Sequence, residues 1–366
     1  MTGALGDAAP LVLPLAECGL ERLHQVGGKA ARLGALQRAG FPGAPGFVLT
    51  TQAYRGLMSA EIARRVRRVL SDVRSEDWTA AVSAARRIRA LIEDEAMPPD
   101  SSRAIAQIYA ALAHDAGISD PPVAIRSSAT AECLATHSFA GQQESFLWVR
   151  GAEQVVAHVR KVWSSLFSPQ AILYRRSIGF PTGKSLMAVV IQRMVDVRTA
   201  GVTFTMNPSN GDRSKIAIEA HWGFGESVVS GEANPDRFMV EKATLQIIAR
   251  TIAAKPWEYA IAAHGCGLAR VPVGDGRRTY PCLSDSEVEA LAALAKAVER
   301  RFGEPQDIEW AIDRHAAGGD GIVLLQSRPE TAWKARPARS GFTPAPDAVS
   351  YVLRGLRGLA RKDSAA

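Results

Sequence analysis

The hydrophobic and polar positions along this chain follow two periods, one typical of helices and one typical of strands. Residues 187–194 are apolar on both faces, which predicts a strand at the centre of a sheet. Residues 27–39 place apolar side chains at helical spacing after a Gly-Gly pair, and residues 53–114 predict an arginine-rich helical layer. Further strands are expected at 47–50, 123–126, 145–149, 201–205, 215–219 and 237–240, and further helices at 152–167 and 284–302. This order of elements predicts an α/β (α+β) fold with mixed sheets.

Two short strands near residue 310 and residue 326 are expected to pair as a hairpin. Because side chains alternate faces along a strand, Asp307 and Glu309 share one face of the first strand. Gln326 and Arg328 share one face of the second strand. Pairing brings two carboxylates, an amide oxygen and a guanidinium together, and this set suits a Mg²⁺-phosphate complex. The alternative is an amphipathic edge hairpin with solvated charges.

Composition narrows the class of protein. The chain has 366 residues, which predicts two or three lobes around a cleft, and its 47% hydrophobic and 22% charged content is that of a soluble globular protein. The net charge of +7 and the pI near 9.4 permit binding of a nucleotide or an acidic partner. The arginines are dispersed, however, and no basic stripe with interleaved aromatic residues indicates nucleic-acid binding.

The cysteines and the apolar segments indicate a compartment. Four cysteines lie far apart, without the paired spacing of a zinc or redox motif: Cys18, Cys133, Cys266 and Cys282. No basic region precedes the apolar patch at the amino terminus, and no run reaches the roughly 18 apolar residues of a membrane span. We therefore expect a reduced, cytoplasmic setting without membrane contact.

One phosphate-binding motif is misleading. Residues 179–185, Gly-Phe-Pro-Thr-Gly-Lys-Ser, have three residues between the glycines where a P-loop needs four, and they precede a strand instead of a helix. A surface turn is the favoured interpretation.

Better candidates for phosphate chemistry are Lys29 at the start of a helix, Arg126 at the end of a strand, the loop at Gly141, and the hairpin. Phosphoryl transfer needs cations and backbone amides that spread charge over the phosphates, and a divalent ion that bridges them. Each residue also has a purely structural interpretation: a surface lysine, an ion pair and a turn glycine.

Taken in order, these segments resemble the ATP-binding domain of phosphoenolpyruvate synthase, pyruvate phosphate dikinase and rifampicin phosphotransferase. The resemblance spans about residues 20–332 and implies an ATP-grasp fold, in which two lobes enclose the nucleotide in a cleft. The segments that carry it are Gly-Gly-Lys at 27–29, Arg-Ser-Ser-Ala-Thr-Ala-Glu at 126–132, Ser-Phe-Ala-Gly-Gln-Gln-Glu-Ser-Phe at 138–146, Gly-Phe-Gly-Glu at 223–226, Asn-Pro-Asp at 234–236, Asp-Ile-Glu-Trp at 307–310 and Gln-Ser-Arg-Pro-Glu-Thr at 326–331.

The resemblance also implies roles. Phosphate-binding and catalytic cations would be Lys29, Arg126 and Arg328. The loop capping the phosphates would contribute Gly141, Gln142 and Ser145. Adenine would be received by backbone groups of a hinge, at Gln192, Met194 and Val195. The Mg²⁺ ligands would be Glu309 and Gln326, with Asp307 near the metal or the ribose, and Glu226 is a weaker nucleotide-binding assignment.

The chain departs from this family in two places. Residues 132–137 are Glu-Cys-Leu-Ala-Thr-His where the family has Glu-Asp-Leu-Pro followed by an acidic residue and alanine, and we interpret His137 as a loop variant in preference to a catalyst. None of the seven histidines lies in the Thr-Ser-His context of the family's phosphorylated histidine.

Our leading hypothesis is the ATP-binding subunit of a split, AMP-forming dikinase, which phosphorylates a histidine of a partner subunit and resembles phenylphosphate synthase, with phenol or a related acceptor. The alternatives are a phosphoenolpyruvate synthase-like component acting on pyruvate, a non-catalytic ATP sensor, and an assembly factor acting through residues 348–359. The expected division is an N-terminal lobe at 1–182, a C-terminal lobe at 183–332, and a basic, proline-rich tail at 333–366.

Overall fold

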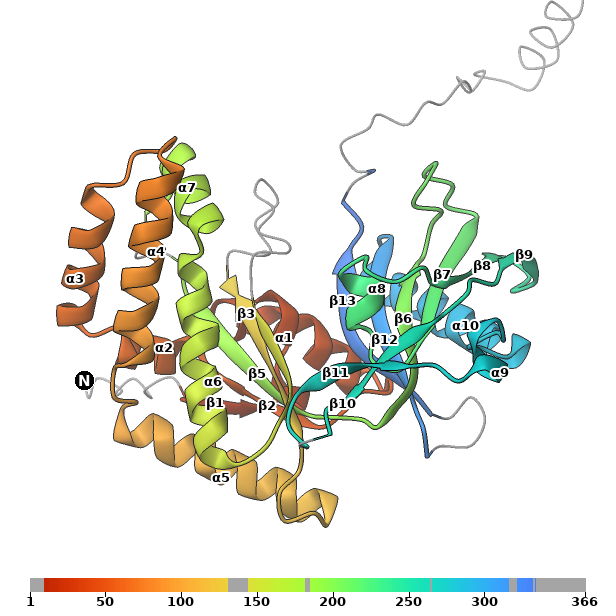
Figure 1. Ribbon diagram of the computed structural model, residues 1–366, viewed down its shortest axis with the longest axis horizontal. Helices are drawn as coiled ribbons and strands as arrows, with labels where there is room; N and C mark the ends of the chain where they lie inside the picture. The colour runs from red at the N-terminus through yellow and green to blue at the C-terminus, as the bar shows by residue number, and fades with distance from the viewer. Residues whose placement is uncertain are drawn as a thin grey trace, which may run out of the picture. The chain divides into compact units, whose positions relative to one another are not determined.

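The computed structural model describes residues 10–130, 144–181, 185–263, 265–315, 321–331 and 333 (Figure 1). Residues up to Pro329 form one compact unit, and Glu330 begins a second. The predicted tail therefore lies outside the described residues, except for Trp333. The part of the chain that the structure describes has no helix long and apolar enough to cross a membrane.

Five antiparallel strands form the first sheet, in the order β1-β2-β5-β3-β4. Its strands are β1 (Val12–Pro14), β2 (Gly46–Leu49), β3 (Val123–Ala129), β4 (Ser145–Val149) and β5 (Met187–Arg193). Strand β5 is central because both its faces are apolar: Met187 and Val189 belong to one core, while Ala188 and Val190 belong to another. The predicted central strand is confirmed.

Helices cover both faces of this sheet (Figure 1). The larger core includes residues of α2 (Thr51–Leu57), α3 (Ala60–Ser71), α4 (Trp78–Glu93), α5 (Pro99–Ala116), α6 (Ala152–Ser164), the 3₁₀ turn η4 (Ser165–Phe167) and α7 (Pro169–Ser177). The opposite core is formed by α1 (Leu23–Arg38) and the 3₁₀ turn η1 (Leu15–Glu17), next to which lies η2 (Leu20–Arg22). The helical layer predicted for residues 53–114 is thus confirmed as four helices.

A glycine fixes the position of α1 on the sheet. Gly27 has φ 72° and ψ 173°, so the helix breaks there, and a Cβ at this position would lie 2.0 Å from the Ser128 carbonyl oxygen. The Ser128 hydroxyl donates to the Val26 carbonyl at 2.7 Å and accepts from the Ala30 amide at 3.0 Å. Only glycine fits this close approach, which sets Lys29 at the start of the regular helix beside β3.

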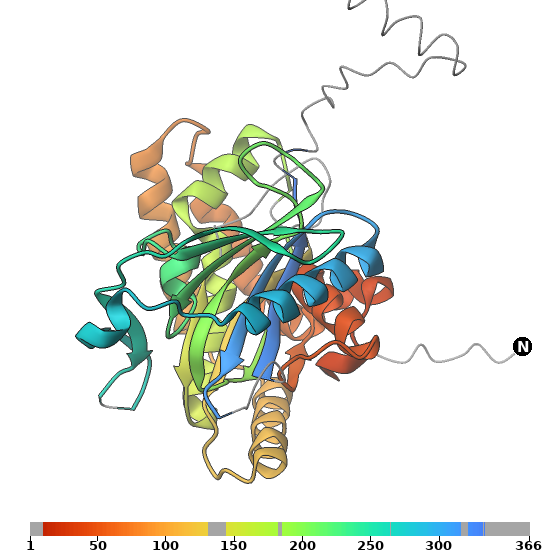
Figure 2. The same ribbon diagram turned by 90° about the vertical axis from the view of Figure 1, so that its right-hand side faces the viewer.

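The second sheet has six antiparallel strands in the order β13-β12-β6-β7-β8-β9. Helix α10 (Asp285–Phe302) crosses one face, where Ile308, Trp310 and Ile312 are buried (Figure 2). The strands are β6 (Val197–Phe204), β7 (Lys215–Trp222), β8 (Asp236–Glu241), β9 (Ile247–Thr251), β12 (Gln306–Asp313) and β13 (Ile322–Pro329). Smaller elements are α8 (Glu226–Val229), the antiparallel pair β10 (Trp257–Ile261) and β11 (Leu268–Pro272), and α9 (Asp275–Arg278).

A buried ion pair joins the start of β8 to two other segments of the chain. The Lys255 ammonium and the Asp236 carboxylate are 2.5 Å apart, and both side chains are fully buried. Asp236 also accepts from the amides of Ala253, at 2.9 Å, and Cys282, at 2.8 Å. All of these contacts converge on one carboxylate, so Asp236 links β8 to the segments before β10 and α10.

The α+β architecture agrees with the predicted ATP-grasp fold class, with one difference. Every ladder between named strands of the described residues is antiparallel, so the sheets are not mixed. The alternation of strands and helices in the sequence does not encode strand direction, which explains this difference. The expected lobe boundary at 182/183 stays a prediction; strand β5 completes the first sheet, and the chain passes to the second sheet between Arg193 and Val197.

Candidate functional site

Arg126 connects the two sheets. It lies in β3, and its guanidinium donates at 2.7 Å to Glu309 Oε2 on β12 and at 2.7 Å to the Leu325 carbonyl on β13. The two charged side chains are only 12% and 14% exposed. The remaining guanidinium nitrogen, Arg126 Nε, is also buried, and no described residue accepts a hydrogen bond from it. A buried donor of this kind carries a desolvation cost that a bound anion would offset.

The hairpin places its polar side chains as the sequence predicts. Asp307 pairs with Arg328, and Glu309 pairs with Gln326, in the β12–β13 register. Gln326 Nε2 donates to Glu309 Oε1 at 2.9 Å, and Arg328 donates from Nε to Asp307 Oδ2 at 2.8 Å. The predicted convergence of two carboxylates, an amide and a guanidinium is confirmed, while the separate pairing of Asp307 with Arg328 divides it into two pairs.

Glu226, at the first position of α8, adds a further carboxylate. The pKa of its carboxyl is raised, first by partial desolvation and then by the nearby Glu309 carboxylate, and Arg126 opposes this shift. The residue as a whole remains exposed. Two carboxylates that repel each other beside a single arginine form a place where a divalent cation would lower the electrostatic energy.

Two further predicted phosphate-binding residues adjoin β3. Ser145 is the cross-strand partner of Arg126 in the β3–β4 ladder and is exposed. Lys29 is half-buried at the start of the regular part of α1. The next residue, Ala30, donates its amide to the hydroxyl of Ser128, which lies two residues after Arg126 on β3. Gly141 and Gln142 lie outside the described residues, as does the 132–137 loop with His137.

The predicted adenine hinge follows β5. Gln192 is buried and donates from Nε2 to the Ala44 carbonyl at 2.9 Å. The Met194 amide donates to the Pro122 carbonyl at 2.9 Å, so a base would have to compete for this N–H group. Met194 and Val195 pack against a small apolar cluster that includes Trp148 and Phe224. The hinge therefore has an apolar wall suited to a flat ring.

Sequence comparisons assign the family. The family model "Pyruvate phosphate dikinase, AMP/ATP-binding domain" matches residues 23–345. The chain belongs to this family. It is 39% identical to a probable phosphoenolpyruvate synthase of Methanocaldococcus jannaschii, over 96% of this chain and 29% of that protein. A phosphoenolpyruvate synthase of Aeropyrum pernix is 40% identical, over 91% of this chain and 44% of that protein.

A relative with a different named activity is equally similar to this AMP/ATP-binding domain. A rifampicin phosphotransferase of a Streptomyces species is 39% identical, over 90% of this chain and 36% of that protein. The chain thus spans between 29% and 44% of the length of these relatives. The resemblance inferred from the sequence motifs is confirmed.

The side chains of this AMP/ATP-binding domain fit a magnesium-nucleotide better than a metal ion alone. Among the described residues, no group of three or more His, Cys, Asp or Glu side chains forms a preformed metal site. Mg²⁺ is commonly bound by one or two carboxylates together with substrate phosphates, so the chemistry of Glu309 and Gln326 fits the protein half of such a site. The unsatisfied Arg126 Nε provides a donor for a phosphate oxygen.

Sequence reasoning missed two residues of this domain. Ser128 positions α1 and Lys29 through its hydroxyl, which only the close contact with Gly27 makes visible. Trp148 has a positive φ of 58°, a buried Nε1 that bonds to no described residue, and an edge-on contact with Phe224 at a centroid distance of 5.7 Å. A tryptophan in a strand is ordinarily a core residue, so no signal in the sequence distinguishes this one.

Proposed function

We propose that this chain binds Mg²⁺-ATP between Arg126 and the β12–β13 hairpin and passes a phosphoryl group to a histidine on a partner subunit. The observation that carries the proposal is the contact of Arg126 with Glu309 and Leu325, in which a buried guanidinium joins the two sheets and keeps one donor unsatisfied. A site of this composition supplies the charge neutralisation on which phosphoryl transfer depends.

The side chains have distinct roles in this proposal. Arg126 and Lys29 hold the nucleotide phosphates, and Arg328 adds a third cation when it leaves Asp307. Glu309 and the amide oxygen of Gln326 would hold the metal; the Gln326 amide would have to rotate for this, because its nitrogen now faces Glu309. The metal, when bound, neutralises charge on the phosphates. Positioning and charge neutralisation lower most of the barrier, so no acid-base residue of this chain is required.

Several of the five described histidines make a local contact through one ring nitrogen. His221 is buried and bonded to the Trp222 carbonyl, and its pKa is lowered mainly by burial. His158 contacts the Gln154 carbonyl on its own helix, and His315 contacts Asp196. A histidine that takes a phosphoryl group must reach the nucleotide with a free ring nitrogen. None of the seven histidines of the sequence lies in a Thr-Ser-His context, which favours an acceptor on a partner.

Two final acceptors are consistent with the proposal. Phenol or a related hydroxylated compound would suit a phenylphosphate synthase-type assembly with AMP and phosphate as the other products. Pyruvate is favoured by the relatives named phosphoenolpyruvate synthase. Comparing phenol-dependent with pyruvate-dependent AMP release in a reconstituted mixture would decide between them.

The test uses the purified chain, ATP labelled at the β-phosphate, and candidate histidine-bearing subunits. We expect acid-labile label on a partner histidine, and a loss of about a hundredfold or more in Glu309→Gln. Glu241→Gln is a matched control, because it removes an ion pair with Lys215 in the same sheet. Label absent from every partner while ATP binds would overturn the phosphotransfer proposal and favour a nucleotide sensor.

A further inference from the structure

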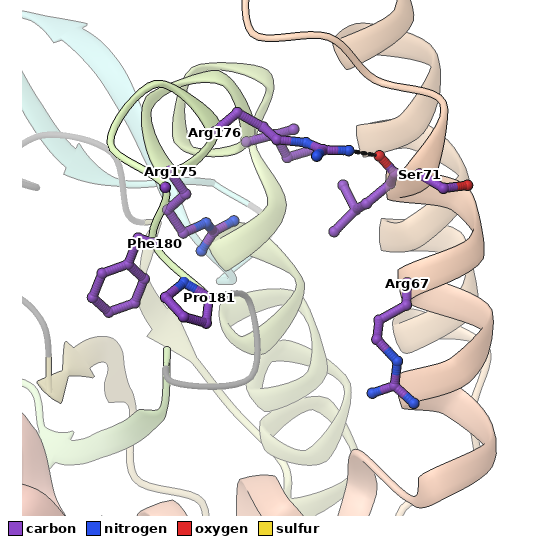
Figure 3. A pocket seen from close by; sticks show the side chains of 9 residues that line it. Arg67, Ser71, Arg175, Arg176, Phe180 and Pro181 are labelled. Carbon is purple, nitrogen blue, oxygen red and sulfur yellow. Dashed lines mark hydrogen bonds between the residues drawn. The ribbon is translucent and has the colours of Figure 1, made fainter.

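A second basic cluster lies in the helical layer. A cavity of about 420 Å³ is bounded by α3, by α7 and by the turn at residues 179–181 (Figure 3). Three arginines line it, Arg67 from α3 and Arg175 and Arg176 from α7. No aspartate or glutamate of the described residues lines it. The cavity therefore combines concentrated positive charge with no acidic counter-ion among the described lining residues.

Arg175 is the buried member of this cluster. The residue is 5% exposed and forms no ion pair with a described carboxylate. Its guanidinium donates to the Leu166 carbonyl and stacks over Phe167, with 5.3 Å between its central carbon and the ring centroid. Burial lowers the pKa of this group to about 10. A buried cation without a partner anion is costly, and one carbonyl and one ring offset that cost only in part.

Arg176 and Arg67 complete the positive wall. Arg176 donates to the Leu70 carbonyl near the end of α3, so it already reaches across to the facing helix. Arg67 is exposed and forms no ion pair with a described residue. Figure 3 shows Arg67 on the opposite side of the cavity from Arg175, which lies beside Phe180 and Pro181. An anion held between them would contact guanidinium groups from two helices.

We propose that this cavity binds a small organic phosphate. Guanidinium groups match phosphate oxygens in pairs, and several of them balance a dianion. The apolar side chains of Leu70, Ile172 and Phe180 give the carbon skeleton a surface to pack against. The volume lies within the range of about 300–1,000 Å³ that is typical of small-molecule sites. The site shares no residue with the Arg126–Glu309 contact, so it stands independently of the proposed function.

The experiment is isothermal titration of the whole chain with glycerol 3-phosphate, at constant ionic strength. Arg67→Ala should weaken binding about tenfold, which is the loss expected for one charge-assisted hydrogen bond. Arg68→Ala is the matched control, because Arg68 is exposed on the same helix and does not line the cavity. We expect it to change binding less than about twofold, since it removes the same charge from outside the cavity, where salt screens its effect on a bound anion.

Further variants locate the site. Arg175→Met should abolish the titration while the circular dichroism spectrum stays unchanged, and Arg126→Lys should leave the titration unchanged. Because Arg175 is part of the core, the exposed Arg67 and Arg68 variants decide the question if Arg175→Met does not fold. Binding absent in the millimolar range, equal weakening by Arg67→Ala and Arg68→Ala, or equally strong binding of lactate, which carries only a carboxylate, would each overturn the proposal.

Discussion

Two ion pairs in this molecule differ in how fully their hydrogen-bonding groups are used. Lys255 and Asp236 are both fully buried, and Asp236 accepts two backbone amides in addition to the ammonium. Arg126 and Glu309 are 12% and 14% exposed, and the buried Arg126 Nε has no hydrogen-bond partner in the described part of the chain. The first pair is complete within the chain, whereas the second leaves a donor that a further group would satisfy.

The difference predicts which ion pair mainly stabilises the fold and which one mainly serves ligand binding. A complete buried network holds segments in one arrangement, and removal of one member leaves an uncompensated charge. An incomplete network at the junction of two sheets retains donors for a ligand at the expense of stability. We therefore expect changes in the first pair to affect unfolding and changes in the second pair to affect phosphotransfer.

The largest expected effect on stability comes from Asp236→Asn. The substitution leaves the Lys255 ammonium buried without its counter-ion and turns an amide group toward two backbone donors. The free energy of unfolding should fall by about 3–5 kcal/mol. Urea unfolding followed by circular dichroism measures it.

Glu241→Gln provides the comparison, because it removes a partly exposed ion pair of the same charge type. Its cost should stay below about 1 kcal/mol. Equal losses in the two variants would show that burial and the extra amide contacts of Asp236 have no energetic consequence.

A smaller effect on stability and a larger one on activity are expected for Arg126→Lys. Lysine keeps the charge but cannot donate to Glu309, Leu325 and a phosphate in the planar arrangement of a guanidinium. Phosphotransfer should fall by about a hundredfold, while the free energy of unfolding changes by about 1 kcal/mol, the worth of one hydrogen bond. Steady-state AMP release and urea unfolding measure the two quantities.

Arg314→Lys is the matched control, because Arg314 also joins a carboxylate, that of Asp196, to a backbone carbonyl, that of Val197. It should change neither quantity by more than the error of the two assays. If Arg126→Lys lowered the free energy of unfolding by as much as the free energy that corresponds to its loss of activity, Arg126 would be a structural residue.

The sequence predicts the hairpin face well and the connections between segments poorly. Alternation along β12 and β13 places Asp307, Glu309, Gln326 and Arg328 together, because strand periodicity is a local property. The antiparallel direction of the sheets and the allocation of β5 to the first sheet depend on partners far along the chain, which no local pattern encodes.

The same limit applies inside the site. Arg126 is identified from a motif, but its contact with Glu309 spans 183 residues of sequence. Neither the link from Ser128 to Ala30 nor the buried Trp148 follows from periodicity, since each depends on a close approach between distant segments. The sequence predicts which residues belong to the site, but it does not predict which of them pair with one another.

The smallest effect concerns the pH dependence of stability through Glu226. Its pKa is raised in the folded protein, so the folded state holds this proton more tightly than the unfolded chain does. The stabilisation from the protonated carboxyl is complete below the ordinary glutamate pKa of 4.5 and is lost as the pH rises through the higher folded pKa. Glu226→Gln should therefore raise the Tm at pH above about 7, by less than about 2 °C because the residue is exposed, and leave it unchanged near pH 4.

Glu289→Gln, at an exposed glutamate of α10, should show no such pH-dependent difference. The same Tm change for Glu226→Gln at both pH values would mean that repulsion from Glu309 does not reach Glu226, and the case for a divalent cation between these carboxylates would lose its electrostatic support.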